Sequence, residues 1–197
     1  MTKDKNITWQ QGKVNYEMRC KALRQQGQIL WFTGLSGAGK SSIAIELEAR
    51  LLANSKAVYR LDGDNIRHGL NSDLAFSKED RDENIRRITE VANLFKDAAI
   101  ITLVSFISPY QAMRDYAREV IGDEYFNEIY VKASLDTCIK RDPKGLYKQA
   151  LKGEIKNFTG VSAPYEVPNN PELVIDTEKS SIKDVVDEIM DEFIKSN

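Results

Sequence analysis

An eight-residue segment with the pattern G-x-x-x-x-G-K-S carries the clearest chemical signal in the chain. It follows the apolar run 29–32, precedes a helical pattern over 42–52, and consists of Gly34, Leu35, Ser36, Gly37, Ala38, Gly39, Lys40 and Ser41. Such a strand–loop–helix unit points backbone N–H groups and a helix N-terminus into one concavity that holds phosphate oxygens. Lys40 would reach the β- and γ-phosphates, and the Ser41 hydroxyl would ligate Mg²⁺. The segment is therefore interpreted as a phosphate-binding loop for a nucleoside triphosphate, rather than as an ordinary glycine-rich turn.

Two carboxylates, Asp62 and Asp64, follow a short predicted strand at 57–61. Open α/β sheets place their ligand sites at the carboxyl ends of strands, so both side chains are expected near the phosphate-binding loop. One carboxylate could accept the proton of an attacking hydroxyl or help to organise Mg²⁺, because phosphoryl transfer depends mainly on positioning and electrostatics. The alternative is that segment 62–65 is a turn with a helix N-cap.

Basic and aromatic residues after this pair could hold a second, anionic substrate. Guanidinium groups offer planar, multiple donors for such a ligand, and four of them lie close together in sequence at Arg67, Arg81, Arg86 and Arg87. Phe76 could stack on a base, although each of these residues taken singly also fits a surface or packing role.

Ser108 lies at the end of a third predicted strand, before Pro109. Its hydroxyl could bind or transiently carry phosphate. It could equally form a turn or cap the next helix, and no adjacent base that would activate it is visible in the sequence.

The elements that must position these groups alternate along the chain. Helical patterns cover about 12–27, 42–52, 77–97 and 182–194, with another beginning at Pro109, and strand patterns cover 29–32, 57–61, 98–106, 128–132 and 173–176. This alternation predicts a doubly wound parallel sheet of about five strands. Stretch 141–171, rich in Lys, Gly, Pro and Asn, could be a solvated loop or a lid that closes over the site.

Composition narrows the function classes further. The formal net charge of −2, from 28 basic and 30 acidic residues, gives no general reason to bind nucleic acid or an anionic membrane. Cys20 and Cys138 lie far apart and form no C-x-x-C pair, which favours a reducing cytosol, and one histidine, His68, cannot supply a Ser-His-Asp triad or a histidine metal cluster. Residues 1–12 lack the apolar core of a signal peptide, and the apolar stretch 98–107 is half of the ~20 residues that a membrane span needs. We expect a cytoplasmic protein without nucleic acid or membrane partners.

The sequence contains neither an Asn-Lys-x-Asp guanine signature nor an apolar run ending in Asp-Glu. These absences weaken the GTPase and motor or AAA-type ATPase interpretations, and a small-molecule kinase remains.

Five segments, taken in order, resemble the motifs of the adenylylsulfate kinase family. They are GLSGAGKS at 34–41, LDGDNIRHGL at 61–70, FISP at 106–109, RDPKGLY at 141–147 and NFTG at 157–160. The phosphate-binding loop alone is shared by many kinases, but its ordered combination with DGDNIR and DPKGLY is highly specific. The likeness covers nearly the whole chain from about Trp9 onward.

This resemblance implies that ATP phosphorylates the 3′-hydroxyl of adenosine 5′-phosphosulfate in sulfate assimilation, giving 3′-phosphoadenosine 5′-phosphosulfate and ADP. It also implies an α/β fold of the P-loop-containing nucleoside triphosphate hydrolase type, a five-stranded parallel sheet flanked by helices and a lid, in one kinase domain over 1–197. Two alternatives stay open, a P-loop kinase for another small nucleotide or metabolite and a regulatory module that binds ATP without transferring it.

The family's residue roles carry over to matching positions. The resemblance implies that Gly34 to Ser41 hold the ATP phosphates with Mg²⁺, that Arg141 lies against the ATP adenine, and that the catalytic residues are Lys40, Asp62, Ser108 and Lys144. Asp62 would lie beside the accepting hydroxyl, and Lys144, in the lid, would approach the transferring phosphate. The acceptor would be bound by a larger set, in which Phe76 and Phe158 clamp its adenine: Asp64, Arg67, Phe76, Arg81, Asn84, Ile107, Ser108 and Phe158.

In the family, the serine matching Ser108 is described as a phosphoserine intermediate. In-line transfer from ATP needs no covalent step, so a binding or structural role competes with that description. The chain departs from the family pattern at Ser162 and Ala163, where an acidic residue commonly precedes Pro-Tyr-Glu, and this puts lid or acceptor contacts there in doubt. No fused sulfurylase segment is seen, so we expect the kinase to stand alone, and we expect a homodimer.

Overall fold

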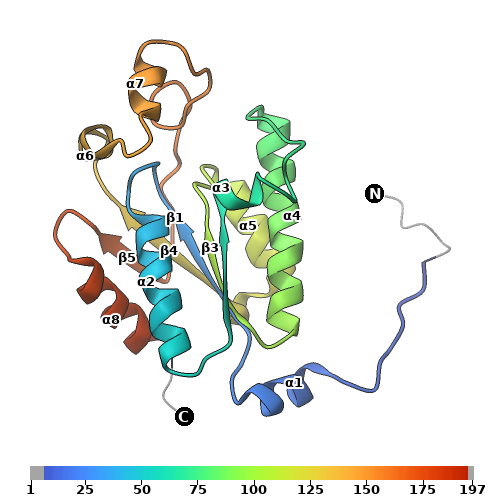
Figure 1. Ribbon diagram of the computed structural model, residues 1–197. Coiled ribbons are helices and arrows are strands. Elements are labelled where there is room, and N and C mark those ends of the chain that lie inside the picture. Colours follow the sequence, from blue (N-terminus) through green and yellow to red (C-terminus); the bar gives the residue numbers. More distant parts are fainter. Residues whose placement is uncertain (1–6, 195–197) are drawn as a thin grey trace.

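The computed structural model describes residues 7–194; residues 1–6 and 195–197, the ends of the predicted 1–197 domain, lie outside that range. Its centre is a parallel five-stranded sheet of order β2-β3-β1-β4-β5, with helices on both faces, as the sequence predicts (Figure 1). The strands are β1 (Gln28–Thr33), β2 (Val58–Asp62), β3 (Ile101–Ser105), β4 (Phe126–Lys132) and β5 (Leu173–Asp176). The helices are α1 (Tyr16–Leu23), α2 (Lys40–Ala53), α3 (Gly63–Ile66), α4 (Lys78–Asp97), α5 (Gln111–Ile121), α6 (Leu135–Arg141), α7 (Leu146–Leu151) and α8 (Ile182–Phe193), with a short 3-10 turn at Asp123–Tyr125.

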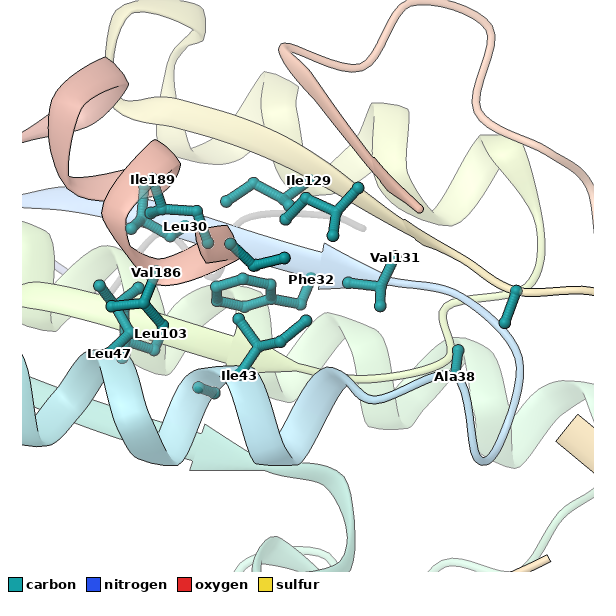
Figure 2. Close-up of a cluster of buried hydrophobic side chains, with 14 of the residues drawn as sticks. Leu30, Phe32, Ala38, Ile43, Leu47, Leu103, Ile129, Val131, Val186 and Ile189 are labelled. Carbon is teal, nitrogen blue, oxygen red and sulfur yellow. The ribbon is translucent and has the colours of Figure 1, made fainter. Parts of the chain in front are cut away.

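The central strand β1 is buried on both faces and separates two apolar cores. Leu30 and Phe32 face α2 and α8, where Figure 2 shows them packed with Leu47 and Val186. Ile29 and Trp31 face the opposite way, toward α4 and α5. Alternate side chains of a strand point to opposite faces, so an uninterrupted apolar run is what a central parallel strand requires. Burying each such side chain contributes about 1.5–3 kcal/mol.

Most predicted boundaries hold to within a few residues, and the exceptions have local causes. The strand predicted at 98–106 begins only at Ile101, because Ala98 caps α4 and Ala99 turns with φ of +62°. Pro109 does not begin α5: Tyr110 is the N-cap and the helix starts two residues later than predicted. The N-terminal helix is shorter than predicted, since it starts after its cap, Asn15, and ends at Leu23.

Three short helices are absent from the predicted helical patterns, although the first of them follows the helix cap that was the alternative for segment 62–65. They are α3, α6 and α7, and α7 lies inside the stretch that the sequence left open between loop and lid. Among residues 7–194, no helix combines the length and hydropathy that a membrane crossing requires.

The parallel register aligns the carboxyl ends of β1, β2 and β3, which precede the predicted site residues, at one edge of the sheet. Asp62 pairs with Ser105 of β3, and Ser105 pairs with Phe32 of β1, immediately before the phosphate-binding loop. In Figure 1, α6, α7 and the chain around them stand beyond this edge. Ligand sites of doubly wound sheets lie at this edge.

Candidate active site

A cavity of about 450 Å³ opens at the carboxyl edge of the sheet. The phosphate-binding loop contributes Ser36, Gly37, Gly39, Lys40 and Ser41 to its lining. Opposite them are the predicted catalytic and acceptor-binding residues, all of which line the same cavity: Asp62, Asp64, Arg67, Phe76, Arg81, Asn84, Ile107, Ser108, Lys144 and Phe158. The remaining predicted ATP-binding residues, Gly34, Leu35, Ala38 and Arg141, are not among its lining residues.

The backbone of the phosphate-binding loop explains its glycines. Gly34 has a φ of +146°, and a Cβ there would come within 2.3 Å of the Val131 carbonyl oxygen. Gly39, with a φ of +113°, is the N-cap of α2, so the first N–H groups of that helix face the loop. The segment is therefore a strand–loop–helix anion site, as its pattern predicts.

Lys40 occupies the mouth of this loop. It is 8% exposed, and its Nζ donates to the carbonyl oxygens of Gly34 and Leu35, each at 2.8 Å. Burial lowers the pKa of the Lys40 ammonium to about 8, and the charge of Lys144 acts in the same direction. A phosphate anion would offset both effects, because an opposite charge favours the protonated form.

Asp62 joins the loop to the second strand end. The Ser41 hydroxyl donates to Oδ2 of Asp62 at 2.7 Å, while Oδ1 accepts the backbone N–H of Asp64 at 3.0 Å and caps α3. One oxygen of this carboxylate therefore caps α3, as the helix-cap alternative predicts, while the other lies against the phosphate-binding loop. A hydroxyl and a carboxylate oxygen this close are the hard donors that Mg²⁺ prefers. Within residues 7–194, no group of three or more His, Cys, Asp or Glu side chains could hold a metal ion.

The acceptor side carries two neighbouring guanidinium groups and an exposed ring. The Cζ of Arg67 lies 4.3 Å from the centroid of the Phe76 ring, and Phe76 is 60% exposed. Burial lowers the pKa of Arg67, and the charge of Arg81 lowers it further. Asn84 is buried beneath them, where its Oδ1 accepts from Nδ2 of Asn71 at 2.8 Å. Two cations that repel each other beside an aromatic face suit an anionic ligand with a flat ring.

Stretch 141–171 contacts both sides of the cavity. Arg81 donates to Asn157 O at 2.6 Å and to Thr159 Oγ1 at 2.9 Å. Lys144 forms an ion pair with Asp64. Thr159 lines the cavity as well and was missed, because only Phe158 of the NFTG segment was assigned a role.

The same stretch reaches the phosphate-binding loop through an aromatic pair. Phe158 packs edge to face against Tyr147, with ring centroids 4.9 Å apart, and the Tyr147 hydroxyl donates to Ser36 O at 3.0 Å. Tyr147 thus links Phe158 to the phosphate-binding loop through one ring contact and one hydrogen bond.

Arg141 lies beside the loop and contacts a residue that the sequence analysis missed. Its Nη1 donates to Thr177 Oγ1 and its Nη2 to Thr177 O, both at 2.9 Å, and the Thr177 hydroxyl donates to Ala38 O. Thr177 follows Asp176 at the carboxyl end of β5, so the strand-end rule applied to Asp62 would have found it. The place of Arg141 against an adenine stays a prediction.

Ser108 has an unusual environment. Its φ is +37°, it is 2% exposed, and its Oγ accepts from the indole Nε1 of Trp31 at 3.1 Å. An indole N–H is a donor and cannot act as a base. The helix-cap alternative was wrong, because Tyr110 holds the N-cap position of α5 without a side-chain bond.

Comparisons with known proteins agree with one another. A family model described as Adenylylsulphate kinase matches residues 26–176. The Adenylyl-sulfate kinase of Staphylococcus carnosus is 53% identical over 190 residues, 96% of each chain. The structure of the Mycobacterium tuberculosis APS kinase CysC in complex with AMPPNP and APS matches with a TM-score of 0.83 and 46% identity, over 87% of this chain and 99% of that one. A hexameric APS kinase from Thiobacillus denitrificans matches with a TM-score of 0.64 and 36% identity, over 85% of this chain and 29% of that one.

We predict that the affinity for a nonhydrolysable ATP analogue falls as the pH rises through about 8, the pKa of Lys40. Below that value Lys40 is charged and can pair with phosphate; above it the neutral amine cannot, so the decline approaches roughly tenfold per pH unit. Calorimetric titrations on either side of that pH measure the decline. The Lys40→Gln variant is the control, with weaker and nearly pH-independent binding expected; an equal decline in that variant would contradict the assignment to Lys40.

Proposed function

Because the chain belongs to the adenylylsulfate kinase family, we infer that it transfers the γ-phosphoryl group of ATP to the 3′-hydroxyl of adenosine 5′-phosphosulfate. The products are 3′-phosphoadenosine 5′-phosphosulfate and ADP, and the reaction belongs to sulfate assimilation. The observation that carries this proposal is the single cavity, in which the phosphate-binding loop faces two guanidinium groups and two aromatic rings.

The donor half would bind ATP with Mg²⁺. Lys40 and the backbone N–H groups of the loop hold the phosphates, and Ser41, supported by Asp62, would hold the ion. When bound, Mg²⁺ neutralises charge on the phosphates. Arg141 and Thr177, which bind each other beside Ala38, would contact the rest of the nucleotide.

The acceptor half would bind the phosphosulfate group between Arg67 and Arg81, and the adenine between Phe76 and Phe158. Asn84, Asp64 and Ile107 complete this pocket. The guanidinium pair supplies charge, and the rings supply stacking area, which a sugar or a small acid without a base could not use.

The transfer step follows from these positions. The 3′-oxygen attacks the γ-phosphorus, the bond to the β,γ-bridging oxygen breaks, and the hydroxyl proton passes to the carboxylate of Asp62. Lys40 and Lys144 stabilise the charge that develops on the transferred group. Lys144 exchanges its ion pair with Asp64 for the phosphate, so Asp64 holds the ammonium at the cavity mouth beforehand.

We also propose a single kinase domain, a lid at 141–171, a homodimer and a cytoplasmic location. None of the residues of α1 is buried, and Val14, Met18 and Leu23 nearby expose apolar surface that a second subunit could cover. Cys20 and Cys138 are free thiols, which suits a reducing compartment. Light scattering that returned the monomer mass of 22.4 kDa would contradict the dimer.

The test of the activity is ADP release in a coupled assay, with and without adenosine 5′-phosphosulfate. We expect strong stimulation by this acceptor. Stimulation only by another hydroxylated metabolite would support the alternative kinase, and ATP binding without stimulation by any acceptor would support a regulatory module.

We predict that Asp62→Asn lowers turnover by roughly 10²- to 10⁴-fold, the usual contribution of a general base. Asparagine is also a good N-cap, so α3 is retained and ATP binding changes little. Steady-state kinetics and titration with an ATP analogue measure the two effects. Asp97→Asn, which removes an exposed ion pair with Arg19 outside the cavity, is the matched control. Near-normal turnover of Asp62→Asn would remove Asp62 from proton transfer.

We predict that Ser108→Ala retains more than about a tenth of the turnover, since it removes one hydrogen bond, from Trp31, and the direct transfer needs no serine. Turnover and incorporation of radiolabelled γ-phosphate into the protein are measured together. Loss of all turnover, with acid-stable label recovered on Ser108 of the unmodified enzyme, would instead establish a phosphoserine step.

A further inference from the structure

Arg114, on α5, is a buried charge outside the cavity, and each nitrogen of its guanidinium lies close to an oxygen. Its side chain is 0% exposed, and its Nε forms an ion pair of 2.6 Å with Oε1 of Glu128, which is 3% exposed on β4. Its Nη1 donates to Ser108 O at 2.7 Å, and its Nη2 donates to Gln111 Oε1 at 2.7 Å and to Glu166 O at 2.9 Å. One rigid fork therefore binds backbone carbonyls of two segments that lie 58 residues apart.

These two segments border the proposed acceptor pocket and the proposed lid. Ser108 belongs to the turn that lines the cavity after β3, and Glu166 lies in stretch 141–171 where the chain returns toward β5. They also bind each other directly, because Glu166 N donates to Pro109 O at 2.8 Å and Gln111 N donates to Glu166 Oε2 at 2.6 Å. The root of the lid is thus fixed to the acceptor wall beside Arg114.

The Ser108 turn needs such support. A φ of +37° is costly for a residue with a side chain, and it persists only where the surroundings over-determine it. Arg114 holds the carbonyl of Ser108, and Trp31 holds its hydroxyl. The arrangement fixes both polar ends of one strained residue.

A buried ion pair is a poor way to gain stability, because its desolvation offsets much of its attraction. Burial raises the pKa of Glu128, and the charge of Arg114 opposes that rise. A pair retained here is better explained by the geometry that a planar, five-donor group imposes than by its contribution to folding.

We infer that Arg114 is a positioning residue that fixes the Ser108 wall of the acceptor pocket against the root of the lid, with Glu128 fixing Arg114. The inference rests on the proposed function for what the pocket binds, but not for the geometry. Misplacing this wall affects binding and reaction of the acceptor and leaves the ATP side unchanged.

The experiment compares Arg114→Lys with Arg118→Lys. The first keeps the charge and loses the fork, so the Glu128 carboxylate stays paired and the protein folds. The second changes the guanidinium one turn along the same helix, which binds Asp123 and Glu172 and lies 3.9 Å from Oε2 of Glu128, a longer contact in which the charge of lysine can stand. We expect Arg114→Lys to raise the KM for adenosine 5′-phosphosulfate and lower kcat, by roughly ten- to a hundredfold in kcat/KM, with the KM for ATP unchanged. We expect Arg118→Lys to leave kcat and both KM values near those of the unmodified enzyme.

A merely structural role gives a different result. Partial unfolding lowers the concentration of active enzyme, and therefore the apparent kcat, while both KM values stay the same. That outcome, or equal changes in the two variants, overturns the inference. The Arg114→Gln/Glu128→Gln double variant, which removes both charges, is expected to fold and to show the same KM pattern as Arg114→Lys.

The fluorescence of Trp31 provides a readout that needs no activity. The chain has two tryptophans, and a Trp9→Phe background leaves Trp31, whose indole binds Ser108, as the single emitter. We expect a shifted Trp31 emission in Arg114→Lys and none in Arg118→Lys. If the unmodified enzyme fails to use adenosine 5′-phosphosulfate, the proposed function falls, and this spectrum still decides the inference; an unshifted spectrum overturns it.

Discussion

The hydrogen bond from Ser41 to Asp62 is the constraint on which the rest of the site depends. It joins residues that follow β1 and end β2, although β3 lies between those strands. The contact exists because Asp62, Ser105 and Phe32 stand in one row across the sheet, and because α2, which carries Ser41 in its first turn, packs against β2 and β3. That row is held by the two apolar cores on either side of β1. Sheet packing thereby sets the spacing between the proposed phosphate donor and the proposed proton acceptor.

The cavity is lined by more cationic than anionic side chains. In the buried network behind it, by contrast, the charge of Arg114 is paired with that of Glu128. Burial lowers the pKa of both Lys40 and Arg67, and each is lowered further by a neighbouring cation. Arg114, by contrast, has a carboxylate and three oxygen acceptors around it. A group poised for an anionic substrate leaves part of its charge uncompensated, whereas a group that positions backbone has its charge paired within the protein. This contrast distinguishes the proposed ligand-binding cations from the proposed positioning cation.

The sequence was sufficient for features that depend on local patterns. The phosphate-binding loop, the five strands and the carboxylate at the end of β2 follow from short-range signals that the sheet then brings together. Short helices such as α3, α6 and α7 were missed, because a helix of one or two turns has little periodicity and depends on tertiary contacts. The bond between Trp31 and Ser108, and the fork of Arg114 to Ser108 and Glu166, join residues far apart in sequence, and no spacing rule indicates them. An arginine in α5 resembles any surface arginine until the fold buries it.

The contacts that hold stretch 141–171 to the rest of the protein differ in strength along its length. This difference determines which part of the stretch could move as a lid. Near its beginning, the contact between Lys144 and Asp64 joins two half-exposed side chains, and such pairs contribute about 0–1 kcal/mol. At its root, Tyr165 shares a part-buried hydrogen bond of 3.0 Å with Thr33, and the buried guanidinium of Arg114 binds the Glu166 carbonyl. Weak, charged contacts can be exchanged for the charges of a substrate, whereas buried contacts that leave a polar group unpaired are costly to break. Movement would therefore be confined to the part around Lys144, and the root would keep its place against the Ser108 turn.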